Sequence, residues 1–340
     1  MKQAVTVAPR SIEIHDAPET EQLADGQALL AIVAVGLCGS DLEMYKGTDP
    51  ISRFPCRQGH EFSGRILALH DGYDGEVRVG DLVAVEPLLP CGSCIACRRG
   101  HPNCCVNLRV AGGQIDGALI ERFVMPVRNL YRADDLTPEA AAFAEPVSIG
   151  LQMVNRSGVV AGDRAVVLGA GPIGQAVILA GRDRGARLLA VDRIAQRLEL
   201  ARATGAEMTV DAAREDVAAM VGAWTDGEGP VVVYEATGAT AVMRQAIELA
   251  AHSGTVVIAG TPTDELSFPA MWLVRKELNI LGSRNNAGVY GEAVRIVREN
   301  QAAVHRIVTH RYPLHQVQDA MEFAIANPAK TGKVMITIGQ

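Results

Sequence analysis

Apolar runs that alternate with amphipathic stretches fill the chain from about residue 159 onward. The runs are short and rich in aliphatic residues, which is typical of buried parallel strands, and they predict strands at residues 165–169, 187–192, 207–211, 231–236, 254–260 and 277–283. Ala-rich stretches that carry Arg and Glu lie between them and predict helices at residues 173–184, 194–204, 213–224, 239–251 and 269–276. This alternation predicts an α/β domain, a parallel sheet covered by helices on both faces.

The first 150 or so residues follow a different pattern. Short β-branched runs at residues 26–36, 63–69 and 81–87 are separated by Gly, Pro and Asp, which predicts an all-β barrel or sandwich with long inserted loops. Beyond residue 283 the pattern predicts two more helices, at residues 289–300 and 314–326, and a last strand at residues 333–338. That strand resembles the first domain more than the second. We therefore expect a chain that leaves its β-rich domain, builds the α/β domain and returns.

Composition and charge narrow the class of protein. The 340 residues are 48% hydrophobic and 21% charged, which fits two globular domains that need no disulfides. A net charge of -7 does not favour nucleic acid or an anionic membrane as partner. The first twenty residues lack the apolar stretch of a secretory signal, and the longest uncharged run, 165–181, is shorter than the ~20 residues that span a bilayer. We expect a cytoplasmic protein.

The cysteines predict a metal site. Five of the seven lie within residues 91–105, and an odd number is a poor fit to a disulfide framework. Four of them follow a C-x2-C-x2-C-x7-C spacing, at Cys91, Cys94, Cys97 and Cys105. Zinc takes four thiolates tetrahedrally, so such a site would brace the loop rather than react, with Cys104 as a spare thiol. Free buried thiols and an iron–sulfur cluster are the alternatives.

A glycine-rich turn predicts a dinucleotide site. A G-x-G-x-x-G sequence at residues 169–174 follows a predicted strand and opens a predicted helix, which suits a turn that receives a pyrophosphate at a helix N-terminus. Asp192 ends the next strand, where its carboxylate can accept hydrogen bonds from the adenosine ribose and repel a 2′-phosphate. NAD is therefore favoured over NADP, although the neighbouring Arg193 could pair with that phosphate. The alternative is a turn that binds no nucleotide.

Cys38 and the pair His60-Glu61 are candidates for a second metal site. Each follows a predicted strand in a glycine-flanked turn, GLCGSD or GHEFSG, where ligands can converge. A catalytic zinc needs three protein ligands and one open position. Taken singly, a free cysteine is more often a small core residue, and a lone histidine is more often hydrogen-bonded structure.

Together these motifs resemble the zinc-dependent medium-chain alcohol and polyol dehydrogenases, such as sorbitol dehydrogenase, over essentially the whole chain. That family joins a GroES-like, β-rich catalytic domain to a doubly wound Rossmann domain. The resemblance implies that residues 1–148 and 286–340 form the catalytic domain and that residues 149–285 form the NAD-binding domain. Details such as Asn103-Cys104-Cys105 and residues 309–313 look most like bacterial sugar-acid dehydrogenases, for example those acting on L-galactonate.

The resemblance also implies a set of ligands and site residues. It assigns the catalytic zinc to Cys38, His60 and a carboxylate, Glu61 or Glu145, and the structural zinc to the four clustered cysteines. Glu145 stands where simple alcohol dehydrogenases commonly carry Cys, which favours hydroxyl-rich substrates. The substrate residues implied are Ser40, Glu145 and Arg284. Cofactor contacts are implied at Gly169, Gly171, Pro172, Ile173, Gly174, Asp192, Arg193, Arg197, Thr237, Gly238, Ala259, Gly260, Gly282, Ser283 and Arg284.

One departure from the family concerns its proton relay. Ser40 keeps the relay hydroxyl, but Glu43 stands where many relatives place the last base, a histidine. Either Glu43 supports proton release or it is an ordinary surface glutamate.

The expected activity is oxidation of a secondary hydroxyl of a sugar acid or polyol to a ketone, with NAD as hydride acceptor and two zinc ions per chain. A threonine or simple-alcohol dehydrogenase is the enzymatic alternative, and a non-catalytic NAD- or zinc-binding sensor is the alternative from another class. Relatives commonly form dimers or tetramers by extending the Rossmann sheet, so a homo-oligomer is expected, with the strand at residues 277–283 at its edge.

Overall fold

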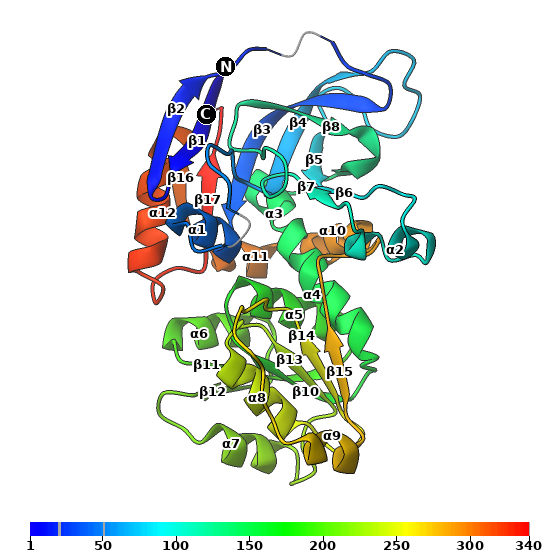
Figure 1. Ribbon diagram of the computed structural model, residues 1–340, viewed down its shortest axis with the longest axis vertical. Coiled ribbons are helices and arrows are strands. Elements are labelled where there is room, and N and C mark those ends of the chain that lie inside the picture. Colours follow the sequence, from blue (N-terminus) through cyan, green and yellow to red (C-terminus); the bar gives the residue numbers. More distant parts are fainter. Residues whose placement is uncertain (20–21, 50–51, 340) are drawn as a thin grey trace. The chain divides into compact units, whose positions relative to one another are not determined.

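Two compact units make up the chain in the computed structural model, which describes residues 1–19, 22–49 and 52–339 (Figure 1). The first unit contains Met1–Glu145 and Tyr290–Gln340, and the second contains Pro146–Val289. No helix in these described ranges is long and apolar enough to cross a membrane.

The second unit is built on a six-stranded sheet whose neighbouring strands are all parallel. Its strand order is β12-β11-β10-β13-β14-β15. The strands are β10 (Arg164–Leu168), β11 (Arg187–Asp192), β12 (Met208–Asp211), β13 (Val232–Glu235), β14 (Thr255–Ile258) and β15 (Asn279–Gly282). Numbered from β10, this order is 3-2-1-4-5-6, that of the Rossmann fold. All six predicted strands are confirmed.

Helices connect these strands at the predicted places. They are α5 (Pro172–Asp183), α6 (Ala195–Thr204), α7 (Val217–Trp224), α8 (Thr240–Leu249) and α9 (Ala270–Lys276), and α4 (Ala144–Ser157) enters the unit. Consecutive residues of β10 from Ala165 to Leu168 are all buried, so both faces of the sheet are covered. The prediction for α7 began four residues too early, because the Asp216 carboxylate accepts a hydrogen bond from Ala219 N (3.1 Å) and caps the helix there.

The first unit contains a seven-stranded, mostly antiparallel sheet. Along it run β16 (Val308–Pro313), β17 (Lys333–Thr337), β3 (Gln27–Leu37), β4 (Glu61–Leu69), β5 (Leu82–Val85) and β9 (Leu130–Arg132), and β8 (Arg122–Pro126) also pairs with β3. The antiparallel pairing of β17 with β3 confirms that the C-terminal strand returns to the first domain. Neither β16 nor the hairpin of β1 (Lys2–Ala8) and β2 (Ser11–Asp16) is marked by the sequence pattern, because β2 is largely exposed and β16 is interrupted by His, Arg and Pro.

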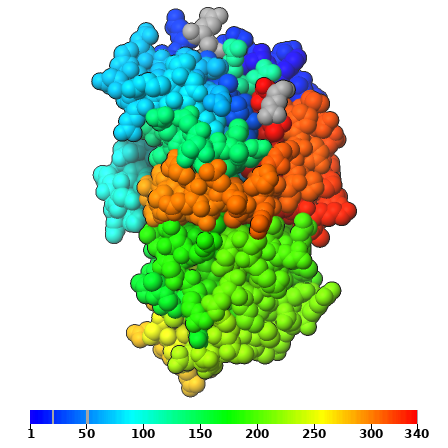
Figure 2. Space-filling model, turned by 180° about the vertical axis from the view of Figure 1, so that it is seen from behind, coloured from blue at the N-terminus to red at the C-terminus, as the bar shows by residue number. Residues whose placement is uncertain are grey.

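Helices and short two-stranded pieces complete this unit. Its helices include α1 (Gly39–Lys46), α2 (Ile95–Arg98), α3 (Pro138–Ala142), α10 (Tyr290–Glu299), α11 (Gln301–Ile307) and α12 (Val317–Ala326). A two-stranded sheet of β6 (Leu88–Leu89) and β7 (Arg109–Val110) flanks the cysteine-rich loop. Figure 2 shows the surface where α10 and α11 (orange) lie, with the segment that includes α3 (green) beside them.

Candidate functional site

The four clustered cysteines converge in the first unit. The Sγ atoms of Cys91, Cys94, Cys97 and Cys105 all lie within 4.8 Å of one another. Cys105 is buried against Leu88 and Leu108, whereas Cys91 is exposed. Hydrogen bonds from the backbone of Ser93 and Cys94 lower the pKa of the Cys91 thiol to about 6. Four sulfur donors in one small volume fit a closed tetrahedral metal site.

Cys38, His60 and Glu61 form the second such group, with their ligand atoms also within 4.8 Å of one another. The register of the first sheet brings them together. Gly36, near the end of β3, pairs with Glu61, the first residue of β4. Because the strands run antiparallel, the turn after β3 and the turn before β4 meet at one edge, and each turn supplies ligands.

Asp41 orients two of these residues. Its Oδ2 accepts a hydrogen bond from Cys38 N at 2.9 Å and lies 3.6 Å from His60 Nδ1, and the Asp41 side chain is 1% exposed. Burial would lower the pKa of His60, but the charge of Asp41 outweighs it and raises the pKa well above its usual value. Because Nδ1 faces Asp41, Nε2 is the His60 nitrogen left for a ligand.

Glu61 is held by a buried lysine, Lys333, that no sequence motif marks. Lys333 Nζ lies 2.7 Å from Glu61 Oε1 and donates a second hydrogen bond to Leu37 O at 3.1 Å. Both side chains are at most 2% exposed. The second carboxylate oxygen, Oε2, is buried and has no hydrogen-bond partner among the described residues. A Cβ on Gly36 would lie 2.2 Å from that oxygen, so glycine at this position leaves the carboxylate room where it lies.

Glu145 lies at the start of α4 and is 6% exposed. Burial raises its pKa to about 7; the charges of Glu61 and Asp41 add to this rise, and those of His60 and Lys333 oppose it. The structure thus surrounds Glu145 with the charges of the second group but leaves it outside the three ligand atoms that meet within 4.8 Å.

The two predicted relay residues lie on α1. Ser40 and Glu43 are both exposed. Ser40 is two residues from Cys38, whereas Glu43 lies a turn further on, between Leu42 and the buried Met44. Exposure of Glu43 fits the surface alternative, and its role stays a prediction.

The glycine-rich turn follows β10 and leads into α5. Gly169 has a φ of 95°, and a Cβ there would lie 2.7 Å from the Thr237 side chain. A Cβ on Gly174 would lie 1.8 Å from Gly169 O, so the helix packs directly on the turn. Nothing lies closer than 3.7 Å to a Cβ built on Gly171, just before Pro172 and Ile173. The helix therefore packs closely on the turn, and the backbone at Gly171 stays open to a pyrophosphate.

Asp192 is fixed beside this turn. Its Oδ2 accepts a hydrogen bond from Ala170 N (2.8 Å), and its Oδ1 accepts two, from Arg193 N (2.7 Å) and Ile194 N (3.0 Å). The Arg197 guanidinium lies 3.8 Å from Oδ2, and the Arg193 side chain is exposed. These contacts hold the carboxylate at the end of β11, next to the phosphate turn, in the place that suits an adenosine ribose.

The remaining predicted cofactor positions also follow the carboxyl ends of parallel strands. Thr237 and Gly238 come after β13, and both donate backbone hydrogen bonds to Oε1 of the buried Glu235, at 2.7 and 3.0 Å. Ala259 and Gly260 follow β14, and a Cβ on Gly260 would lie 2.3 Å from Gly238 Cα. Gly282 ends β15, and Ser283 and Arg284 come next. Glu235, which anchors this edge, was missed because nothing in its spacing marks it.

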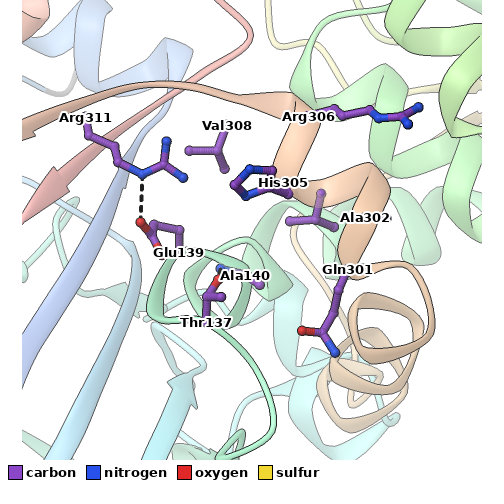
Figure 3. Close-up of a pocket in the computed structure, with 10 residues that line it drawn as sticks. Thr137, Glu139, Ala140, Gln301, Ala302, His305, Arg306, Val308 and Arg311 are labelled. Carbon is purple, nitrogen blue, oxygen red and sulfur yellow. Dashed lines mark hydrogen bonds and ion pairs between the residues drawn. The ribbon is translucent and has the colours of Figure 1, made fainter.

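A groove of about 410 Å³ lies elsewhere in the first unit, between α3 and α11 (Figure 3). An ion pair between Arg311 Nε and Glu139 Oε1, at 2.8 Å, crosses its wall. None of the predicted site residues lines it.

The family described as "Alcohol dehydrogenase GroES-like domain" matches residues 24–135, and the family described as "Zinc-binding dehydrogenase" matches residues 172–299. Together these spans cover most of the chain. The chain belongs to the zinc-binding alcohol dehydrogenase family.

Relatives within the family show what kinds of protein the chain is similar to. It is 33% identical to L-galactonate-5-dehydrogenase of Escherichia coli K12, over 92% of both chains, and 31% identical to sorbitol dehydrogenase of Bacillus subtilis 168, over 99% of this chain and 97% of that one. A solved structure from E. coli CFT073, an alcohol dehydrogenase complexed with NADH, superposes with a TM-score of 0.91 at 26% identity and covers 99% of both chains.

Family membership confirms several expectations. The GroES-like and Rossmann fold class, the dehydrogenase activity and the zinc and nicotinamide chemistry agree with the matches. Because the family is zinc-binding, zinc is favoured over an iron–sulfur cluster at the four clustered cysteines.

Proposed function

We propose that this chain oxidises a secondary hydroxyl of a sugar acid or polyol to a ketone and passes the hydride to NAD. The observation that carries the proposal is the convergence of Cys38, His60 and the buried Glu61, with the nearby carboxyl of Glu145. A thiol, an imidazole and a carboxylate are the mixed donor set of catalytic zinc, in contrast to the all-sulfur set of the other group.

Each residue of the group has a separable task. Cys38 and His60 would hold zinc together with a carboxylate, Glu61 or Glu145, and the other four cysteines would hold the structural zinc. When bound, the catalytic zinc supplies a Lewis acid that lowers the pKa of the hydroxyl being oxidised. Asp41 fixes the His60 ring, and Lys333 holds Glu61 by one oxygen. Ser40 would take the hydroxyl proton outward, with Glu43 as the predicted next acceptor.

The preference for NAD rests on Asp192. Its carboxylate is fixed by three backbone hydrogen bonds, so it stays where a 2′-phosphate would be repelled. The Arg193 side chain is exposed and can turn toward solvent. We expect Asp192→Ala to relax the preference, measured as the ratio of kcat/KM for NAD to that for NADP. Higher kcat/KM with NADP in the unaltered enzyme would contradict the assignment.

The substrate class rests on two supports. The relatives named above act on a sugar acid or on sorbitol, and Arg284 stands just beyond the last Rossmann strand. A guanidinium there can grip a carboxylate with two parallel hydrogen bonds. A charged pair of this kind favours an aldonate over the matching polyol by roughly tenfold to hundredfold.

NADH absorbance with a substrate panel tests the function. We expect L-galactonate, L-gulonate or L-idonate to be oxidised with higher kcat/KM than sorbitol, galactitol, xylitol, threonine or simple alcohols. Equal or better turnover of the neutral polyols would overturn the carboxylate grip and leave a polyol dehydrogenase. Turnover of threonine alone would indicate the other enzymatic class. Binding of NADH without turnover of any member would indicate a sensor.

We also propose a homo-oligomer formed through the second unit. β15 is an edge strand of the parallel sheet, as expected, and no residue of the adjoining α9 is buried. Met271, Leu273 and Val274 of α9 are 51%, 39% and 79% exposed, an apolar surface that a second copy would cover. Analytical ultracentrifugation should show a dimer or tetramer that Val274→Glu dissociates. A monomeric unaltered protein would exclude the oligomer.

The domain and compartment assignments complete the proposal. We assign the catalytic domain to residues 1–148 and 286–340 and the NAD domain to residues 149–285. None of the seven cysteines, all within the described residues, forms a disulfide, which supports function in a reducing compartment such as the cytoplasm. Non-reducing electrophoresis of protein from a native lysate should show no disulfide-linked species.

A further inference from the structure

Residues 57–59, here called the His60 turn, lead directly into His60, and a second segment of the chain binds all three of their carbonyls. The donors are consecutive backbone amides: Gly117 N to Arg57 O (2.7 Å), Ala118 N to Gly59 O (2.9 Å) and Leu119 N to Gln58 O (3.1 Å). The Arg57 side chain adds a bond from Nε to Gly117 O at 2.7 Å. The course of the His60 turn is therefore set by residues 117–119.

The two backbones approach more closely than a side chain between them would allow. A Cβ on Gly117 would lie 2.5 Å from both Gln58 O and Gly59 O. A Cβ on Gly112, at the other end of the same segment, would lie 2.6 Å from Gly59 C. A methyl group at either position would therefore push the 112–119 segment and the His60 turn apart.

The 112–119 segment is anchored independently of the His60 turn. Just before it, Ala111 N donates to Pro87 O at 3.0 Å, and at its far end Ala4 N of β1 donates to Leu119 O at 2.8 Å. Ala118 and Leu119 are at most 1% exposed. Because a segment that is held at both ends and packed in the core yields little, a larger side chain in it displaces the turn.

A displaced turn reaches the His60 ring by two routes. The first is the chain itself, since His60 directly follows Gly59. The second is Gln58, a fully buried side chain whose Nε2 donates to Asp41 O at 2.8 Å. The Asp41 carboxylate lies 3.6 Å from His60 Nδ1 and orients the ring. Changes to the groups that orient a metal ligand typically weaken metal binding by roughly tenfold to hundredfold.

We propose that Gly117, together with Gly112, is a positioning residue for the catalytic metal site: by admitting the His60 turn so closely, the 112–119 segment sets where the His60 ring stands. Neither glycine is among the residues that the family resemblance implies. The inference rests on the proposed function, which assigns His60 to the catalytic zinc, and it adds a segment that acts on the metal only through His60.

Metal affinity measures this role without turnover. Dialysis against dipicolinate removes the more weakly held zinc, and cobalt is titrated back with its visible absorption as the signal. For Gly117→Ala we expect the cobalt Kd to rise roughly tenfold to hundredfold while the zinc of the four cysteines is retained. Gly113→Ala is the matched control, because neither glycine has a left-handed φ and the nearest described contact of a Cβ on Gly113 is Val110 Cβ, at an ordinary 3.6 Å. Its cobalt Kd should stay within about twofold of the unaltered value.

A double-mutant cycle separates positioning of His60 from general support of the fold. In a His60→Ala background the cobalt Kd is already raised, and adding Gly117→Ala should raise it by less than about twofold, because the side chain through which it acts is gone. Should Gly117→Ala fold poorly by thermal unfolding, Arg57→Met takes its place. It removes the Nε bond to Gly117 O, and it should raise the cobalt Kd by roughly threefold to tenfold only where His60 is present.

The possible outcomes are distinct. Equal rises in the cobalt Kd with and without His60, or loss of the four-cysteine zinc as well, would show that Gly117 supports the fold as a whole and would overturn the inference. An unchanged cobalt Kd in Gly117→Ala would overturn it too. If the unaltered protein took up no cobalt in place of the removed zinc, the proposed catalytic metal site would fail and the inference with it, which is a different result from either.

Discussion

The two candidate metal sites of the first unit are built in opposite ways. Cys91, Cys94, Cys97 and Cys105 come from one loop of fifteen residues, and one of the four is exposed and one buried. Cys38, His60 and Glu61 come from the ends of two strands and are held by Asp41 and by Lys333, which is 272 residues from Glu61 along the chain. The first group is closed by its own spacing, whereas the second exists only once the sheet has formed.

This difference in construction suits the loop group to a structural role and the strand-end group to a catalytic one. Four like donors leave no open position, so the loop group can hold a segment together and do little else. The strand-end group has mixed donors and buried charges that are balanced by a lysine and an aspartate, which is costly to build and typical of a site that must react. The predictions below test whether stability and activity divide between the two groups in this way.

The largest expected effect is on turnover. Cys38→Ser should lower kcat/KM by roughly a thousandfold or more, because Lewis-acid stabilisation of several kcal/mol is lost with the metal. Zinc, counted by mass spectrometry of metals, should fall from two ions per chain to one, and the thermal midpoint should change little. Cys104→Ser, which removes an exposed thiol outside both groups, is the control. Retained activity with one zinc per chain would remove the distinction between the groups.

The next largest effect is on the free energy of unfolding. Lys333→Met would leave Glu61 buried without its cation, and breaking a buried pair in this way costs about 3–5 kcal/mol. Urea unfolding followed by circular dichroism measures the loss, and Lys330→Met, at an exposed lysine three residues away, should cost almost nothing. A loss below about 1 kcal/mol would mean that the buried pair contributes little net stability to the fold.

A smaller, local effect is expected at the loop group. Cys97→Ser should release one zinc and leave the second in place, so that residues 91–105 open by local unfolding while the rest of the first unit stays folded. Limited proteolysis should cut this loop in the variant and spare it in the unaltered protein. Turnover should stay within roughly tenfold, since the loop supplies no proposed catalytic ligand. Loss of turnover as complete as in Cys38→Ser would show that the two groups act as one.

The same contrast explains which site residues could be predicted from the sequence. The loop cysteines and the glycines at residues 169–174 could be recognised from the sequence, because their chemistry depends on local spacing. The roles of Asp41, Lys333 and Glu235 could not be predicted. Asp41 and Lys333 act on partners that only the fold brings near, and Glu235 acts on a turn that only the backbone conformation shows. The apolar runs and the Gly, Pro and Asp residues between them predicted all six Rossmann strands. They did not predict β16, whose polar residues are tolerated at the edge of a sheet.

The smallest expected effect lies outside both groups, at the Arg311–Glu139 ion pair in the groove wall (Figure 3). Burial would raise the pKa of Glu139, but the hydrogen bond from Arg311 outweighs it and leaves the pKa below its usual range. A carboxyl whose folded pKa is depressed contributes stability that is present above its unfolded pKa, about 4.3, and that is lost as the pH falls through the folded value.

Arg311→Gln should therefore cost more stability at pH 7 than at pH 3. The expected cost at pH 7 is only about 0.2–1 kcal/mol, because Arg311 is 40% exposed and solvent screens the pair. Urea unfolding at the two pH values measures the difference, and Arg306→Gln, an exposed arginine on the same groove, is the matched control. Zinc content and turnover should stay unchanged. An equal cost at both pH values would trace the effect to lost packing of the arginine stem rather than to charge, since only the charge on Glu139 is removed by acid.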